Sequence, residues 1–381
     1  MMELLYKIFS TPNIELIYPA LAVSATALFI LGLILLLKKL KIVAVALFIA
    51  GVSDIAIALL GYFVASDLSQ YALLPFSSDD AKIIFYISPG DSLAKTAKRL
   101  SELKIITHPE KFVAYARRLQ KTEIKKGEYE LSRNITPDQI LDMFYNGKVK
   151  TYKITVPEGC HYRQIASLFA EQNLIDEKEF LALAGDKNFL KSIGINSPSA
   201  EGYLFPDTYL ITRDYTAKKL LKEMVKRFNE NYTEEIDKRA KQLGLTKEEV
   251  VTLASIIEKE TGAPEERALI SGVFHNRLKK KMKLQTDPTV IYAEILDTGG
   301  FDGNITKSDL LREHPYNTYT RFGLPPGAIA SPGKAALTAA VNPEKTDALY
   351  FVSKNDGTHI FCPTYECHEK YVNIYQRGGE K

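Results

Sequence analysis

Two long apolar stretches near the N-terminus restrict what this chain can fold into more than any other feature. One runs from Ile17 to Leu37 and the next from Ile42 to Ala65, and Asp54 is the only acidic residue in them. Each is long enough to cross a bilayer as a helix. The lysine-rich segment between them, Lys38 to Lys41, should stay cytoplasmic under the positive-inside rule. Both termini, and everything after residue 66, are then expected outside the cytoplasm.

A cleaved signal peptide fits this pattern poorly. Its positive charges should precede the apolar run, whereas the lysines here follow the first run. Asp54 is expected to be either protonated near the bilayer centre or turned towards a partner helix.

Composition excludes several classes of function. The chain has 381 residues, which leaves room for two or three domains, and a formal net charge of +3. That charge is too small to indicate nucleic-acid binding, and no basic run is interleaved with aromatic residues. The glycine-rich nucleotide motifs and the His-Glu-x-x-His zinc motif are absent from the sequence. We therefore expect no cofactor and no metal.

Changes in composition divide the chain into segments. Strands are predicted at 83–87 and 127–131 and helices at 92–103 and 137–144, which indicates a small α/β module. The order of strand, Pro-Gly-type turn and helix recurs at 152–172 and suggests an internal duplication. The expected segments are an N-terminal segment at 1–16, two transmembrane helices at 17–65, a polar linker at 66–81, the small module at 82–150 and a larger domain at 151–376.

Further elements are predicted in the larger domain. Helical segments are expected at 177–184, 216–243 and 268–281, and residues 284–333, rich in Pro, Gly, Asn and Thr, are expected to be surface loops. Alternation on either side of Asn355-Asp-Gly357 predicts a closing hairpin.

The stretch from Thr246 to Gly262 reads as a single helix. Thr246 and Glu249 form a capping-box pattern, and Gly262 is the expected left-handed cap at the other end. The apolar residues at helical spacing predict one buried face: Val250, Leu253, Ala254 and Ile257.

Two carboxylates stand at the end of this helix. Glu258 falls at the edge of the apolar face, where partial burial would raise its pKa towards that of a general acid. Glu260 is two residues further on, on a different face, and is expected to point to solvent. The alternative is that Glu258 is an ordinary solvated residue at the end of an amphipathic helix.

The motifs around this helix resemble those of the MltG/YceG-like family of endolytic peptidoglycan (murein) transglycosylases. The resemblance covers roughly residues 82–375 and rests on motifs in the family's order: Glu201-Gly-Tyr-Leu-Phe-Pro-Asp-Thr-Tyr209, Ser255-Ile-Ile-Glu-Lys-Glu-Thr261, Val273-Phe-His-Asn-Arg-Leu-Lys279, Leu284-Gln-Thr-Asp-Pro-Thr-Val-Ile-Tyr292, Asn317-Thr-Tyr319 and Gly323-Leu-Pro-Pro-Gly-Ala-Ile-Ala-Ser-Pro-Gly333. It implies that the first Glu of the second motif, Glu258, is catalytic.

The resemblance implies a membrane-anchored lyase that cuts the β-1,4 bond between N-acetylmuramic acid and N-acetylglucosamine in nascent glycan strands and leaves 1,6-anhydro ends. Glu258 would protonate the bridging oxygen and then deprotonate the 6-hydroxyl. The residues expected to bind substrate, or else to scaffold loops, are Glu201, Tyr203, Gln285, Asp287, Asn317 and Tyr319. A lysozyme-like muramidase remains an alternative if Asp207, Asp287 or Glu201 faces Glu258, and a non-catalytic peptidoglycan-binding scaffold is another.

The implied fold class is α+β: an N-terminal transmembrane helical hairpin, a LysM-like module that binds glycan or serves as a spacer, and a larger α+β catalytic domain. Peptidoglycan glycan strands and the membrane are the expected partners, with peptidoglycan synthases and the division machinery as further candidates. The expected location is the bacterial cell membrane. Cys362 and Cys367 are close enough in sequence to form a disulfide outside the cytoplasm, and we expect a disulfide or free thiols rather than a metal site.

Overall fold

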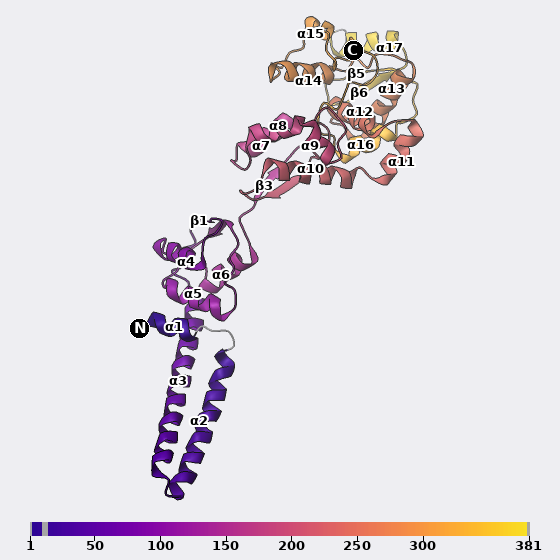
Figure 1. The fold of residues 1–381 in the computed structure, drawn as a ribbon. Coiled ribbons are helices and arrows are strands. Elements are labelled where there is room, and N and C mark those ends of the chain that lie inside the picture. Colours follow the sequence, from indigo (N-terminus) through magenta and orange to yellow (C-terminus); the bar gives the residue numbers. More distant parts are fainter. Residues whose placement is uncertain (1, 10–13, 379–381) are drawn as a thin grey trace. The chain divides into compact units, whose positions relative to one another are not determined.

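The structure is a computed structural model that describes residues 2–9 and 14–378. The chain divides into two compact units, residues 1–151 and 152–381 (Figure 1). Both mix helices with small antiparallel two-stranded sheets, so the α+β expectation is confirmed. Each unit is described by itself below.

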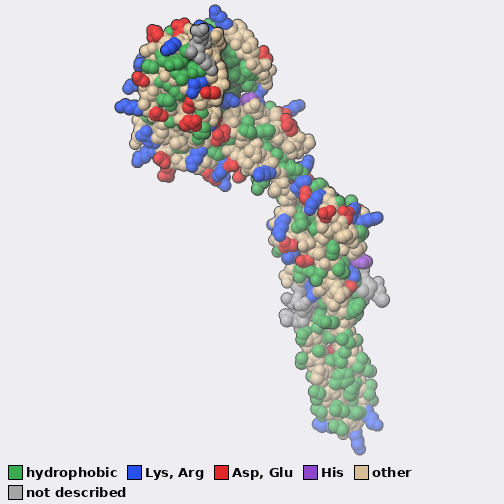
Figure 2. Space-filling view, turned by 180° about the vertical axis from the view of Figure 1, so that it is seen from behind, with side chains coloured by type: hydrophobic (Ala, Val, Ile, Leu, Met, Phe, Trp, Pro, Cys, Tyr) green, Lys and Arg blue, Asp and Glu red, His purple; other side chains and the backbone are tan. Residues whose placement is uncertain are grey.

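The first unit begins with a short helix, α1 (Met2–Phe9), and a pair of long helices, α2 (Ile14–Leu37) and α3 (Lys41–Leu73). Both long helices are apolar enough and long enough to cross a membrane. Figure 2 shows hydrophobic side chains over their surface and lysines at the tip of the hairpin. Asp54 accepts a hydrogen bond from Ser24 on the partner helix, 3.1 Å away, which is one of the two expected situations.

The prediction of a polar linker at 66–81 is wrong for residues 66–73, because α3 continues to Leu73. Leu68 and Tyr71 are buried there, and Tyr71 belongs to the core of the following module. Burial of these side chains stabilises two further helical turns that hydropathy alone does not reveal.

That module is built on an antiparallel pair, β1 (Ile83–Ile87) and β2 (Gly127–Leu131), with Ile83 opposite Leu131. Helices α4 (Leu93–Glu102), α5 (Pro109–Arg118) and α6 (Pro137–Asn146) pack on it. Its core includes Phe85, Tyr129 and Phe144, whose rings contact one another. Helix α5 was not expected; it opens with Pro109 in the first turn, where proline is tolerated because its missing N–H has no helical partner.

The second unit opens with a similar order of elements. Strand β3 (Tyr152–Thr155) pairs antiparallel with β4 (Thr208–Ile211), and three helices lie between them: α7 (Tyr162–Ala170), α8 (Glu177–Gly185) and α9 (Lys187–Ser192). The helical segment expected at 216–243 consists of two helices, α10 (Ala217–Asn231) and α11 (Glu234–Leu243). The break falls at Thr233, whose side chain caps α11.

Helix α12 (Lys247–Glu260) runs through the core of this unit. The capping box of Thr246 and Glu249 is confirmed, but Gly262 is not a left-handed cap, because the helix ends at Glu260 and Thr261 is extended. Every residue from Val250 to Ile257 is buried. The helix is therefore enclosed on all sides rather than amphipathic, and four elements surround it: α11, α13 (Arg267–Lys279), α14 (Asp287–Thr298) and α16 (Lys334–Val341).

The expectation of surface loops at 284–333 is wrong where α14 and α15 (Lys307–Leu311) lie. Helix α14 has Pro288 in its first turn and Gly299 as its left-handed cap, so the residues that suggested loops are helix boundaries here. A short 3-10 helix, η1 (Pro264–Glu266), joins α12 to α13.

The chain closes with the expected hairpin, β5 (Tyr350–Ser353) and β6 (His359–Cys362), followed by α17 (Tyr365–Tyr375). A disulfide joins Cys362 to Cys367, with their Cα atoms 5.6 Å apart. It ties the first turn of α17 to the last residue of β6.

Candidate active site

The last turn of α12 sends three consecutive side chains into three different surroundings. Glu258 enters a cluster of charged groups, Lys259 borders a large cavity, and Glu260 borders a smaller polar cavity. A helix turns by about 100° per residue, which accounts for this separation.

The Glu260 cavity has a volume of about 410 Å³. The carboxyl of Glu260 accepts a hydrogen bond from the Thr286 hydroxyl. Burial, and the nearby charge of Asp287, raise the pKa of Glu260 to about 7. The walls come from α13, the start of α14, the 317–319 segment, the hairpin and α17, and they include Arg277, Gln285, Asp287, Tyr319, Tyr350 and His368.

The expectation that Glu260 points to solvent is wrong. Glu260 follows the buried residues Ile256 and Ile257 by four and three positions, so it lies on their side of the helix. The spacing of Glu260 from Ile256 and Ile257 is therefore the sequence signal for its position. The prediction of solvent exposure fails because it assumes one buried face, whereas the helix is buried on all sides.

Three residues expected to bind substrate meet in this cavity: Gln285, Asp287 and Tyr319. The Tyr319 hydroxyl donates to Asp287 Oδ1 at 2.5 Å. Asp287 is the first residue of α14, where the free N–H groups favour a negative charge. Gln285 has a φ of +47°, an uncommon value for a residue with a side chain. The backbone there is held by a hydrogen bond from its N–H to the Thr318 carbonyl.

Arg277 was not singled out from the sequence, although its motif was. It is buried, and its guanidinium donates to the carbonyls of Leu284 and Leu349, each at 2.6 Å. It also lies 5.1 Å from the centre of the Tyr350 ring. Arg277 therefore holds the loop before α14 and the start of the hairpin, both of which border the cavity.

Glu258 has different neighbours. Its Oε1 lies 3.3 Å from Arg267 and its Oε2 accepts a hydrogen bond from the Gly333 N–H at 2.9 Å, at the start of α16. Only 5% of the side chain is exposed, and it is not among the lining residues of either cavity. The half-exposed Glu158 lies 4.0 Å from Arg267, and burial together with the charge of Glu258 raises the pKa of Glu158. Sequence reasoning read the Val156–Gly159 stretch only as a strand and turn.

The other expected substrate-binding residues lie in the interior. Glu201 accepts hydrogen bonds from the Tyr162 N–H and the Tyr292 hydroxyl, and burial raises its pKa to about 8. Tyr203 packs on Phe228 in the core.

The remaining two candidates have structural partners of their own. The side-chain amide of Asn317 donates to three carbonyls near α15 and accepts from the Tyr319 N–H. Asp207, considered as a second carboxylate, pairs with Arg227 at 2.5 Å. These contacts give both side chains a structural role.

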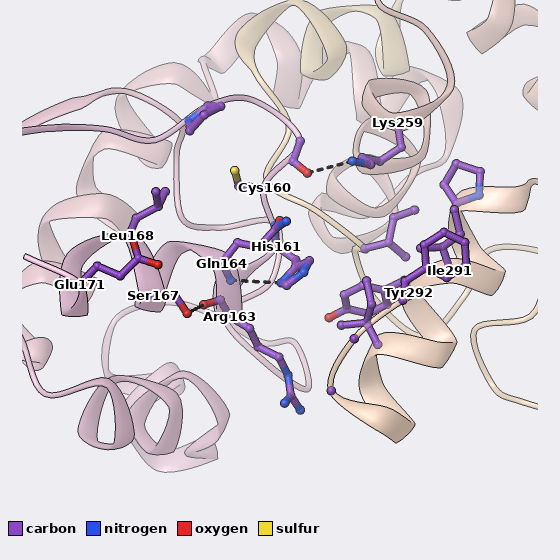
Figure 3. Close-up of a pocket in the computed structure, with 18 residues that line it drawn as sticks. Cys160, His161, Arg163, Gln164, Ser167, Leu168, Glu171, Lys259, Ile291 and Tyr292 are labelled. Atoms are coloured by element: carbon purple, nitrogen blue, oxygen red, sulfur yellow. Dashed lines mark hydrogen bonds between the residues drawn. The ribbon is translucent and has the colours of Figure 1, made fainter. Parts of the chain in front are cut away.

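A second cavity, the Lys259 cavity, lies between α7 and α14 (Figure 3) and has a volume of about 830 Å³. Its polar lining residues include His161, Arg163 and Lys259, and its apolar lining residues include Leu168 on α7, Ile291 and Ile295 on α14, and Phe301 after α14. Among the described residues, no group of His, Cys, Asp or Glu side chains is arranged to hold a metal ion.

The Glu260 cavity is suited to proton transfer. A carboxyl group whose pKa is about 7 can both donate and accept a proton near neutral pH. A second carboxylate, Asp287, borders the same space, and the tyrosines offer flat surfaces with a polar end.

Comparisons with known proteins find similar sequences over most of this chain. The model of the YceG-like family matches residues 85–374. The endolytic murein transglycosylase of Bacillus subtilis (strain 168) is 33% identical over 305 residues, which covers 76% of this chain and 83% of the relative. The protein of that name from Streptococcus pneumoniae serotype 2 (strain D39) is 29% identical over 334 residues, which is 79% of this chain but 60% of the relative.

A solved structure is similar as well. A crystal structure of a yceG-like protein from Listeria monocytogenes matches with a TM-score of 0.53 and 34% sequence identity, covering 77% of this chain and 99% of that one. The family match spans α12 and every residue that lines either cavity except Gln376. This chain belongs to the YceG-like family.

Proposed function

We propose that this protein is an endolytic murein transglycosylase. The relatives from Bacillus subtilis and Streptococcus pneumoniae carry that name, and the first is matched over most of its length. The reaction cuts the bond between N-acetylmuramic acid and N-acetylglucosamine inside a glycan strand. The muramic acid's own 6-hydroxyl, rather than water, attacks the carbon at the cut.

In this mechanism one carboxyl group serves twice. As an acid it gives its proton to the bridging oxygen, so that the bond from the muramic acid C1 to that oxygen breaks. As a base it then takes the proton of the 6-hydroxyl while the bond from C1 to O6 forms. The carboxyl ends as it began, and the product is a 1,6-anhydro end.

Glu258, the first Glu of the motif Ser255-Ile-Ile-Glu-Lys-Glu-Thr261, is our candidate for that group. Its Oε1 lies 3.3 Å from Arg267 and its Oε2 accepts a hydrogen bond from the Gly333 N–H. It also lies next to Gly159, which borders the Lys259 cavity, and this neighbourhood is the observation that carries the proposal. Glu260 is the alternative, because burial raises its pKa to about 7 and it borders a polar cavity together with Asp287.

The two glutamates can be separated by matched variants. Glu258→Gln keeps size and removes the proton, so release of anhydro-ended fragments should fall by about a hundred- to ten-thousand-fold. Glu260→Gln is the matched control, and we expect a smaller loss of activity from it. Both variants should be assayed on purified glycan strands, with melting temperatures alongside. Near-normal turnover by a folded Glu258 variant, with turnover abolished in the Glu260 variant, would make Glu260 the catalytic residue instead.

A second candidate function, a lysozyme-like muramidase, is favoured by Asp287. This second carboxylate borders the same cavity as Glu260 and raises its pKa. Two facing carboxylates are what a hydrolase uses. The mass of the product separates the two reactions, because an anhydro end is lighter than a reducing end by one water. A third reading, a non-catalytic glycan-binding scaffold, would be supported if the wild-type protein bound strands and released no fragments.

We further propose that residues 17–65 anchor the chain in the bacterial cell membrane, with both termini outside the cytoplasm. The lysines at the hairpin tip and the apolar surface of α2 and α3 support this placement. The active site would then face the cell wall. There it could meet its candidate partners, peptidoglycan synthases and the division machinery.

Residues 82–150 are our candidate for a LysM-like glycan-binding module, and residues 151–376 for the catalytic domain. Two exposed side chains on one face of β1, Ile84 and Tyr86, support a role in binding. A spacer remains the alternative, and an unchanged affinity of Tyr86→Ala for glycan strands would favour it.

A further inference from the structure

One buried arginine in the second unit lies between two carboxylates. Arg267, the first residue of α13, has its Nη2 atom 3.3 Å from Glu258 Oε1 and 4.0 Å from Glu158 Oε2. Among the described residues, no other carboxylate lies within ion-pair distance of it. The Arg267 Nε is buried and has no hydrogen-bond partner in the same part of the chain. The charge of this guanidinium is therefore balanced by these two glutamates.

The two glutamates differ in how firmly they are held. Glu258 stands on α12 and only 5% of its side chain is exposed, whereas 49% of the Glu158 side chain is exposed, in the turn between β3 and α7. Burial and the charge of Glu258 raise the pKa of Glu158, while the charge of Arg267 lowers it. Glu158 is therefore the member of the cluster that is free to move.

Gly333 brings the two carboxyl groups together at a second point. Its N–H donates to Glu258 Oε2 at 2.9 Å, and a Cβ atom at this position would collide with the Glu158 carboxyl. The φ of Gly333 is −75°, which any residue can adopt, so the backbone does not require a glycine here. The absence of a side chain leaves room for Glu158 beside Glu258.

The neighbouring titratable groups have contacts elsewhere or carry no charge here. Those with other partners are Lys259, which donates to the Gly159 carbonyl, Glu266, which pairs with His359, and Asp287, which accepts from Tyr319. Burial raises the pKa of the Cys160 thiol, which stays neutral, and Glu265 and Lys334 are exposed. The balance of charge at Glu258 is therefore set mainly by Arg267 and Glu158.

The contacts of Glu258 suit only one of the two forms that the proposed reaction needs. A nearby cation and an N–H donor both stabilise an ionised carboxyl group. Glu258 must nevertheless carry a proton when it acts as the acid. Protonation would take from the buried Arg267 its closer anion, and leaving a buried charge unpaired is strongly destabilising.

We propose that Glu158 is a positioning residue that becomes the counter-ion of Arg267 whenever Glu258 is protonated. This inference rests on the proposed function, in which Glu258 is first an acid and then a base. Shortening the 4.0 Å distance to that of a charged hydrogen bond needs a movement of about 1 Å at the end of a half-exposed side chain. Once Glu258 is neutral, the repulsion that raises the pKa of Glu158 is gone, so Glu158 ionises more readily.

Melting temperatures of four full-length proteins in detergent test this inference without an assay of activity. Glu258→Gln stands in for the protonated acid, because its amide is neutral and of the same size. Adding Glu158→Gln to that variant removes the remaining anion beside Arg267 and should lower the melting temperature by about 3 °C. Glu158→Gln alone should not lower it, because Glu258 still pairs with Arg267 and two carboxylates no longer repel each other. An equal effect of Glu158→Gln in the two backgrounds would overturn the inference.

The pH profile of kcat/KM on purified glycan strands measures the same coupling during the reaction. The value falls on the alkaline side as the free enzyme loses the proton of its acid. Without Glu158, Arg267 is balanced by Glu258 alone, so we expect the alkaline limb of Glu158→Gln to lie about one pH unit lower, with KM unchanged. Glu158→Asp keeps the charge and should keep the wild-type limb. The matched control is Glu223→Gln, an exposed residue on α10.

Two results of the activity assay contradict the inference. One is a wild-type pH profile in Glu158→Gln, and the other is a raised KM with an unshifted limb, which would mean that Glu158 binds the sugar directly. A wild type that cuts no strand at any pH would contradict the proposed function instead. The melting temperatures would then still decide whether Glu158 and Glu258 share Arg267.

Discussion

Glu260 changes its protonation state near neutral pH because its carboxyl is buried beside Asp287. Its ordinary pKa is 4.5, and in the fold it is about 7. Between these values the folded protein holds a proton that the unfolded chain has released. This group therefore contributes stability that is fully present below pH 4.5 and is lost as the pH rises through about 7.

Glu260→Gln should remove that dependence. Relative to the wild type, the variant should gain stability between pH 5 and pH 8, by at most about 3 kcal/mol if the whole shift is realised. The measurement is the melting temperature of both proteins in detergent at the two pH values. Glu235→Gln, an exposed residue on α11, should track the wild type at both. A constant difference between Glu260→Gln and the wild type would argue against a buried, titrating carboxyl.

How far the site could be predicted varies from residue to residue. The sequence motifs selected Gln285, Asp287 and Tyr319, which the structure brings together. They also selected Asn317 and Glu201, which have structural partners. The Asn317 amide donates a hydrogen bond to the Arg312 carbonyl next to α15, and the buried Glu201 accepts one from the Tyr292 hydroxyl. A motif marks residues that matter to a region, but only packing decides which of them border open space.

At the level of elements, the boundaries set by local chemistry were predictable. The Thr246 cap, β1, β2 and the last hairpin follow from capping and alternation. Helix α14 was missed because its Pro and Gly residues, which mark its ends, were read as loop signals. The enclosure of α12 could not be predicted, because a helix buried by four neighbouring elements has no helical periodicity of apolar and polar residues in its sequence.

The disulfide between Cys362 and Cys367 holds α17 against the hairpin, and α17 supplies Tyr365 and His368 to the Glu260 cavity. Reducing it should destabilise this segment by about 2 kcal/mol, a value expected for so short a loop. We expect activity to fall as well, because one wall of the cavity would loosen.

Activity with and without a thiol reductant, in the wild type and in Cys367→Ser, measures this effect. Cys160→Ser, which leaves the bridge intact, should respond to reductant as the wild type does. Mass spectrometry that found free thiols at both positions in protein from its native envelope would contradict the bridge.

On the scale of the whole molecule, the family match begins at residue 85, after the apolar helix pair. The placement of that pair is therefore predicted from its own residues. If Lys38, Lys39 and Lys41 hold the hairpin tip in the cytoplasm, a tag after residue 381 should be digested by protease added to intact cells. A tag inserted between Lys39 and Leu40 should be protected until the membrane is broken. The opposite pattern of digestion would reverse the proposed topology.

The last turn of α12 also limits how this segment can change in length. Glu258, Lys259 and Glu260 each meet a different environment because each is turned by about 100° from the one before. One residue inserted after Ile257 would place Glu258 in the Lys259 cavity and Lys259 in the Glu260 cavity, whereas deletion of one residue there would place Lys259 against Arg267. Single replacements here affect one environment at a time, whereas a single insertion or deletion changes all three. Natural and engineered variants should therefore differ in the identity of these residues far more readily than in their number.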